Sequence, residues 1–167
     1  MARASKMGAL VLCLGAAATA GSVFDGRYAL DKSRSANVEK AIGEATESMN
    51  FVTRPIARSR LGKTNQTSAG VSIAVTDRIE VDFGTKPISA PLDGAAVPWT
   101  RPDGETFQVR AGIDPDKLVE TFQGKDGSRR NTFSLLDGGK SLAMDVQVDS
   151  PRLPKPVRYR LVYARVP

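Results

Sequence analysis

The stretch VSIAVTDRIEVDF, residues 71–83, contains two short runs in which apolar and polar side chains alternate. Its apolar positions are the alternate residues Val71, Ile73, Val75, Ile79, Val81 and Phe83. A period of two is typical of β-strands that have one dry face and one wet face. The stretch therefore predicts two neighbouring antiparallel strands and not a helix.

The same alternation continues to the end of the chain. Its later apolar positions are Val97 and Trp99, Phe107 and Val109, Leu118, Val119 and Phe122, Phe133 and Leu135, Leu142 to Val148, and Tyr159 to Tyr163. Asp-Gly pairs at 93–94, 103–104, 126–127 and 137–138 separate these segments. Because Asp-Gly favours tight hairpin turns, the pattern predicts a meander of sequential antiparallel strands, about eight or nine in number.

One strand and a helical segment are predicted ahead of this meander. Gly26-Arg27-Tyr28-Ala29-Leu30 alternates like the later strands. Apolar side chains then follow at helical spacing in Val38, Ala41, Ile42, Ala45 and Met49, which predicts a short amphipathic helix. Residues 55–61 are consistent with a second helix opened by Pro55, and an irregular strand is the alternative.

So many strands favour closure of the sheet. A long twisted sheet tends to curl or split, and closure into a barrel removes its exposed edges. We therefore predict an all-β protein in which residues 21–167 form a single up-and-down barrel of about eight to ten strands, with one or two short helices after the first strand. A two-layer β-sandwich is the alternative fold.

Residues 1–20 have the pattern of a secretory signal peptide. Arg3 and Lys6 precede an apolar run, and Ala18-Thr19-Ala20 is a small-x-small cleavage site. The sequence thus predicts a cut near Ala20 and a periplasmic or secreted protein. A buried N-terminal helix is one alternative. Lipid attachment at Cys13 is another, and Leu12 disfavours it because lipoprotein signals have a small residue at that position.

Composition excludes much of the familiar catalytic chemistry. The chain has no His and one Cys, so it cannot build a Ser-His-Asp or Cys-His relay, a zinc site with His ligands or an iron–sulfur cage. We expect no metal and no cofactor. Without residues 1–20 the chain keeps 22 basic and 18 acidic residues, a net charge of +4. This mild basicity favours weak attraction to anionic surfaces over nucleic-acid binding.

Helices inserted directly after the first strand of a β-meander resemble the layout of the calycins, and most of all the fatty-acid-binding-protein type. The opening Gly26-Arg27-Tyr28 is similar to the Gly-x-Trp start of these barrels, with Tyr28 in place of the usual Trp. The resemblance covers roughly residues 24–165 and implies a barrel lidded by paired helices around a small hydrophobic ligand. The chain departs from the family in its last strand, where Tyr163-x-Arg165 reverses the carboxylate-binding Arg-x-Tyr.

Two sets of candidate functional residues follow. The candidate ligand-binding residues are the inward aromatic and sulfur side chains Trp99, Phe107, Phe122, Phe133, Met144, Tyr159 and Tyr163. Their alternative role is to fill the barrel as a solid core. The candidate membrane-contact residues are the cations on or beside the helical lid, Arg54, Arg58, Arg60 and Lys63. Their alternative role is that of a solvated helix face.

These features predict a monomeric, non-enzymatic protein that binds a small hydrophobic, lipid-like molecule and touches anionic membranes weakly. The rival hypothesis is an interaction or inhibitor module of the cell envelope, with a filled barrel and no internal ligand. A third hypothesis is an enzyme that uses Tyr and Asp or Glu as acid and base in the barrel.

Overall fold

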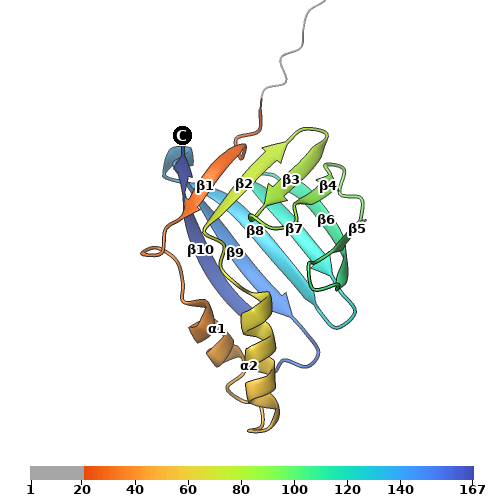
Figure 1. Ribbon diagram of the computed structural model, residues 1–167. Helices are drawn as coiled ribbons and strands as arrows, with labels where there is room; N and C mark the ends of the chain where they lie inside the picture. The colour runs from red at the N-terminus through yellow and green to blue at the C-terminus, as the bar shows by residue number, and fades with distance from the viewer. Residues whose placement is uncertain (1–20) are drawn as a thin grey trace, which may run out of the picture.

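The computed structural model describes residues 21–167, so the predicted signal peptide and Cys13 lie outside the described residues. Ten strands form one antiparallel sheet in the order β4-β3-β2-β1-β10-β9-β8-β7-β6-β5. The sheet curls into a nearly closed barrel with two helices at one end (Figure 1). This arrangement confirms the predicted all-β barrel and not the sandwich.

The elements have the following bounds: β1 Gly26–Leu30, α1 Val38–Ala45, α2 Thr53–Thr64, β2 Gly70–Val75, β3 Arg78–Asp82, β4 Ile88–Pro91, β5 Val97–Thr100, β6 Thr106–Asp114, β7 Lys117–Gln123, β8 Ser128–Leu136, β9 Ser141–Asp149 and β10 Val157–Val166. A single 3-10 turn, Asp137–Gly139, joins β8 to β9. Strands that follow one another pair, except at β4 and β5, and β1 pairs with both β2 and β10.

Three of the four Asp-Gly pairs connect paired strands as predicted. The exception is Asp93-Gly94, which lies between β4 and β5, the two edges of the sheet, so its prediction as a hairpin turn was wrong. Gly94 still adopts a φ of 79°, which favours glycine, but the turn leads the chain across a seam. At this seam the Trp99 indole donates a hydrogen bond of 3.0 Å to the Pro87 carbonyl.

Both predicted helices are present. In α1 the Asn37 side chain accepts from the Lys40 amide at 3.0 Å, which caps the helix, while Ile42 is buried. The helix ends at Ala45, so Met49 lies beyond it. The α2 helix contains Pro55 in its first turn, where a missing amide proton costs nothing, and this confirms the helical prediction over an irregular strand.

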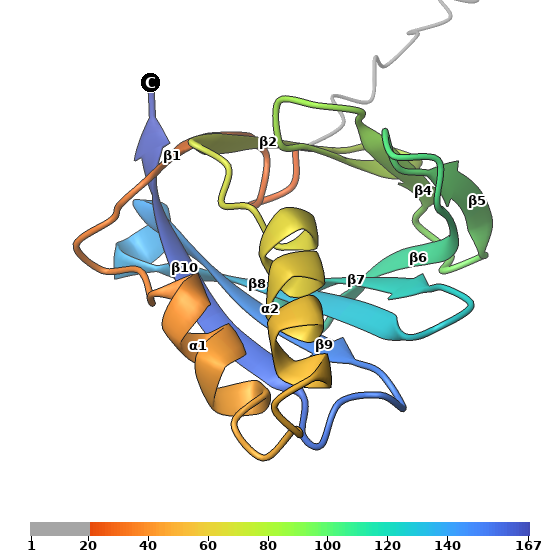
Figure 2. The same ribbon diagram turned by 60° about the horizontal axis from the view of Figure 1, so that its bottom comes forward.

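The helices pack on each other and over one end of the barrel (Figure 2). Arg58 holds α2 against α1, because its guanidinium donates to the Thr46 hydroxyl at 3.0 Å and to the Gly43 carbonyl at 3.3 Å. No residue of α2 is fully buried, and Leu61 is its partly buried contact with the core. Within residues 21–167 no helix is long and apolar enough to span a membrane.

Candidate functional site

A row of inward side chains crosses four strands beneath the helices. The cross-strand partners along it are Glu120 on β7, Asn131 on β8, Val146 on β9 and Tyr159 on β10. The adjacent row on the same face consists of the apolar residues Leu118, Phe133, Met144 and Leu161. Three of the four side chains in the first row are therefore polar, whereas the adjacent row is apolar throughout.

Glu120 is the most unusual member of the first row, since its side chain is 0% exposed. Its Oε2 accepts a hydrogen bond of 3.2 Å from the Asn131 amide, whereas its Oε1 has no hydrogen-bond partner among residues 21–167. Burial raises the pKa of Glu120 from 4.5 to about 7, although the Asn131 hydrogen bond and the nearby Arg129 charge both lower it. The carboxyl group thus titrates near neutral pH.

Arg129 connects this carboxyl to the lid. Its Nε donates to Asn131 Oδ1 at 2.8 Å, and its Nη1 donates to Asn65 Oδ1 at 3.2 Å. The Tyr159 hydroxyl donates to the same Asn65 oxygen at 3.1 Å. A guanidinium and a phenol therefore converge on one neutral oxygen.

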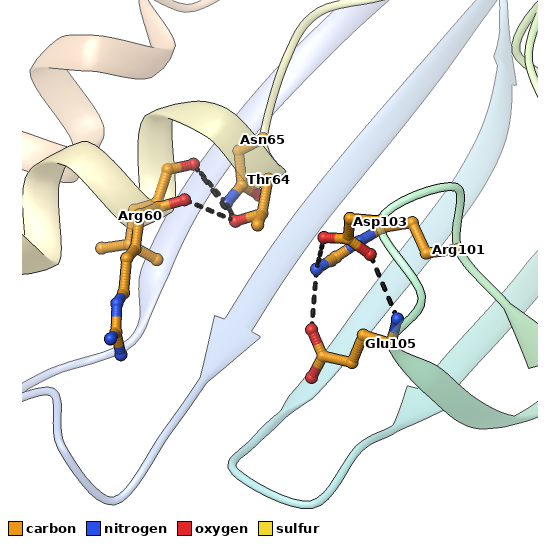
Figure 3. A network of polar contacts seen from close by, with 7 residues as sticks. Arg60, Thr64, Asn65, Arg101, Asp103 and Glu105 are labelled. Carbon is orange, nitrogen blue, oxygen red and sulfur yellow. Dashed lines mark hydrogen bonds and ion pairs between the residues drawn. The ribbon is translucent and has the colours of Figure 1, made fainter.

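Asn65 follows directly after the last residue of α2 (Figure 3). Its Nδ2 donates to the Leu61 carbonyl at 2.9 Å, which satisfies one of the free carbonyls at the helix end. Only 4% of Asn65 is exposed. One side chain thus caps the lid helix with its nitrogen and occupies the interior donors with its oxygen. The same view shows the Arg101, Asp103 and Glu105 ion-pair cluster of the β5–β6 turn.

Tyr163 is a second buried polar group without a partner among the described residues, at its hydroxyl. Burial and then the neighbouring Tyr159 raise the pKa of Tyr163 to about 12, against the lowering effect of Arg129. Arg165 does not join it, because its guanidinium donates instead to the carbonyls of Val23, Asp25 and Gly139. Tyr163-x-Arg165 is therefore not a joint anchor, and the interior cation is Arg129.

The seven predicted ligand-binding residues fall into two groups. Trp99, Phe107 and Phe122 form an aromatic cluster whose ring centroids lie 6.0 to 6.4 Å apart. The larger apolar cluster holds the other four, Phe133, Met144, Tyr159 and Tyr163. All seven contribute to packing, and their contact with a ligand stays a prediction.

Sequence reasoning missed the polar residues Glu120, Arg129, Asn131 and Asn65. The sequence pattern could have identified Glu120, Arg129 and Asn131, because they occupy inward positions of strands in which apolar and polar residues alternate. Glu120 lies between Leu118 and Phe122 in the alternation, and Asn131 lies two residues before Phe133. Asn65 lies in a connection after a helix and gives no such signal.

The four predicted membrane-contact cations have different surroundings. The Arg54 guanidinium donates to the Met49 carbonyl at 2.6 Å, and Arg58 is bound to α1. Arg60 and Lys63 are exposed, and within residues 21–167 their side chains form no hydrogen bond or ion pair. Exposed apolar side chains lie in the same segment: Phe51 is 85% exposed, Val52 59% and Ile56 55%.

No protein-family model matches the sequence, and no curated protein is significantly similar to it. Solved structures do match. A lipid binding protein of Caenorhabditis elegans is 16% identical, with a TM-score of 0.56 over 86% of this chain and 96% of its own. The zebrafish ileal bile acid-binding protein, complexed with cholic acid, is 9% identical, with a TM-score of 0.55 over 87% and 100%.

A secretory abundant heat soluble protein of Ramazzottius varieornatus is also similar, at 10% identity and a TM-score of 0.61 over 87% of this chain and 97% of its own. Identities this low support the fold alone. The chain has the fold of the fatty-acid-binding-protein barrels, with two short helices after its first strand, as the resemblance of its sequence implied.

Proposed function

We propose that the protein is a non-enzymatic carrier of an amphiphile whose apolar chain lies in the barrel and whose anionic head group binds Arg129 and Tyr159. The observation that carries this proposal is the convergence of these two donors on Asn65 Oδ1. A carboxylate oxygen in that position would accept the same hydrogen bonds and add the attraction of opposite charges. Structural neighbours described as lipid and bile acid binding proteins support the proposal.

Burial of the apolar chain of such a ligand contributes enough free energy to support binding. Burial of a methylene contributes about 0.8 kcal/mol, so a hexadecanoyl chain contributes roughly 13 kcal/mol before an association cost of about 4 to 15 kcal/mol. Space for the chain requires movement, because Leu118, Phe133 and Leu142 are all 0% exposed. The α2 helix buries no residue fully, so its movement would expose little buried surface.

Displacement of a fluorescent fatty acid by hexadecanoic acid tests the proposal. Arg129→Gln removes the interior charge, and we expect it to weaken binding about tenfold or more. Arg130→Gln is the matched control, because Arg130 is the next residue of β8 and is exposed on the outer face. Equal affinity of both variants, or no saturable binding by the natural chain, would contradict an Arg129-anchored carrier.

The filled interior favours one second candidate, an interaction or inhibitor module that binds another envelope protein without an internal ligand. Mass spectrometry of an extract of the purified protein distinguishes the two functions. A co-purifying amphiphile supports the carrier. Absence of lipid together with absence of saturable dye binding supports the interaction module.

Location and membrane contact belong to the same proposal. The pattern of residues 1–20 supports export to the periplasm or medium, and the N-terminal residue of the protein isolated from its host tests the cut near Ala20. The exposed Phe51, Val52 and Ile56 beside Arg60 and Lys63 support contact of the lid with an anionic membrane. Each cation near such a surface contributes about 1 kcal/mol.

A further inference from the structure

The Glu120 Oε1 atom is a buried acceptor position with nothing to bind among the described residues. It lies on the inward face of β7, where Asn131 satisfies only the other carboxyl oxygen. Buried polar groups in proteins are nearly always paired, with protein, water or ligand. The missing partner of Oε1 is therefore sought outside the described residues, in a ligand or a water molecule.

We infer that Glu120 Oε1 binds a hydroxyl group of the ligand, so that the preferred cargo is a hydroxylated acidic amphiphile and not an unsubstituted fatty acid. The inference rests on the proposed function, because it assigns a second polar contact to the ligand held by Arg129. It also assigns a role to Asn131, which holds the carboxyl in place through its other oxygen.

A hydroxyl group fits this position better than other ligand groups. With a pKa of about 7, Glu120 is present in both protonation states near neutral pH. A hydroxyl donates to the carboxylate and accepts from the carboxylic acid, so it pairs with either state. An ammonium group would be repelled by Arg129, a second carboxylate would be repelled by ionised Glu120, and a methylene would leave Oε1 unpaired.

The position of Glu120 also specifies where the hydroxyl lies on the ligand. One asparagine side chain separates the Arg129 guanidinium from the Glu120 carboxyl, through hydrogen bonds of 2.8 and 3.2 Å. Glu120 and Asn131 are direct cross-strand partners, and such side chains lie close together. The hydroxyl group therefore lies near the acidic head group and not at the far end of the chain.

Three acids of equal chain length test the inference by isothermal titration of the full-length mature protein. They are hexadecanoic acid, 3-hydroxyhexadecanoic acid as separate enantiomers, and 16-hydroxyhexadecanoic acid. We expect one enantiomer of the 3-hydroxy acid to bind about tenfold tighter than hexadecanoic acid, because it satisfies a buried polar atom. The 16-hydroxy acid is expected to bind no tighter than hexadecanoic acid.

Variants at position 120 complete the test. Glu120→Leu should abolish or reverse the preference, since an apolar side chain gains nothing from the hydroxyl. Glu120→Gln should retain a preference, because its amide can still pair with a hydroxyl and with Asn131. Glu80→Gln, at an exposed position of β3, is the control for loss of a carboxylate.

The possible outcomes separate this inference from the function beneath it. Saturable binding of all three acids with equal affinity would overturn the hydroxyl site and leave the carrier intact, with a buried water as the partner of Glu120. Failure of every acid to bind would overturn the carrier itself. Should Glu120→Leu fail to fold, the comparison of the three acids on the natural chain still decides the question.

Discussion

The Arg165 guanidinium lies over the Tyr28 ring, 4.8 Å from its centroid, and its Nη2 donates to the Tyr28 hydroxyl at 2.6 Å. Arg165 also donates to three backbone carbonyls and lies near the C-terminal end of β10, which is at the end of the barrel away from the helices (Figure 1). Gly26 makes the approach possible. Its φ is 146°, and a Cβ there would lie 2.8 Å from Arg165 Nη1.

Arg165→Ala should therefore lower the free energy of unfolding by about 2 kcal/mol, through loss of the cation–π contact and of several hydrogen bonds to backbone oxygens. Urea denaturation measures this change. Arg158→Ala is the control on the same strand, because its exposed guanidinium donates one hydrogen bond, to Gln147; a change within about 0.5 kcal/mol is expected there. An equal decrease in the free energy of unfolding of both variants would contradict the structural role assigned to Arg165.

The buried Glu120 should make stability depend on pH between 4.5, its ordinary pKa, and about 7, its pKa in the folded chain. In this range the folded state holds a proton that the unfolded state has released, so stability falls as pH rises. The full effect is on the order of 3 kcal/mol. Glu120→Gln cannot bind this proton. The free energy of unfolding of this variant, relative to that of the natural chain, should therefore rise between pH 4.5 and about 7 and stay constant above that range.

Urea denaturation of both proteins at a series of pH values checks the sign and the range. Glu80→Gln again serves as the exposed control. A constant difference between the natural chain and Glu120→Gln from pH 4 to 8 would show that the carboxyl titrates in the same way in both states.

Asn65→Ala should loosen the lid and tighten ligand binding at the same time. The variant loses the hydrogen bond to the Leu61 carbonyl, and it leaves Arg129 and Tyr159 free to bind a head group. We expect faster amide hydrogen exchange in α2 and several-fold tighter binding of hexadecanoic acid. Gln66→Ala, at the exposed neighbouring position, should change neither. Weaker binding by Asn65→Ala would mean that the asparagine assists the ligand instead of competing with it.

Removal of the exposed lid features should slow transfer of a fluorescent fatty acid to vesicles that contain anionic lipid. The variant combines Phe51→Ser with Arg60→Gln and Lys63→Gln, and it spares Arg54 and Arg58 because these hold the lid together. The control carries Lys117→Gln and Lys140→Gln, an equal change of charge at two exposed positions, the first residue of β7 and the residue directly before β9. Equal transfer rates for the lid variant and the control would contradict the proposed contact of the lid with the membrane.

The wall of the barrel could be predicted from the sequence because it depends on local patterns. Alternation of apolar and polar residues, such as that from Val71 to Phe83, indicates which face of a strand is buried, and it predicted most of the strands. Asp93-Gly94 shows the limit of such reasoning. The dipeptide favours a turn. Whether the strands on either side of it pair depends on how the whole sheet closes, and a short segment of sequence carries no information about that.

The polar site escaped prediction for a related reason. Glu120 and Asn131 interrupt apolar faces, and each alone is compatible with a solvated strand end. Their contact depends on the register between β7 and β8, and the approach of Asn65 depends on how α2 crosses the barrel. Charge gave no signal for this site either, because the cations of α2 lie close together in the sequence, whereas Arg129 is a single arginine within a polar strand.

The seam between β4 and β5 gives the barrel wall a property that a closed ladder lacks. Every other junction between neighbouring strands in the described chain is a row of backbone hydrogen bonds, whereas this one is bridged by the Trp99 indole on the Pro87 carbonyl. The circumference of the barrel is therefore held at this junction by side chains, through one hydrogen bond and the apolar packing around it. The girth of the barrel thus depends at this one place on side-chain contacts, with the Trp99 indole among them, and not on the backbone.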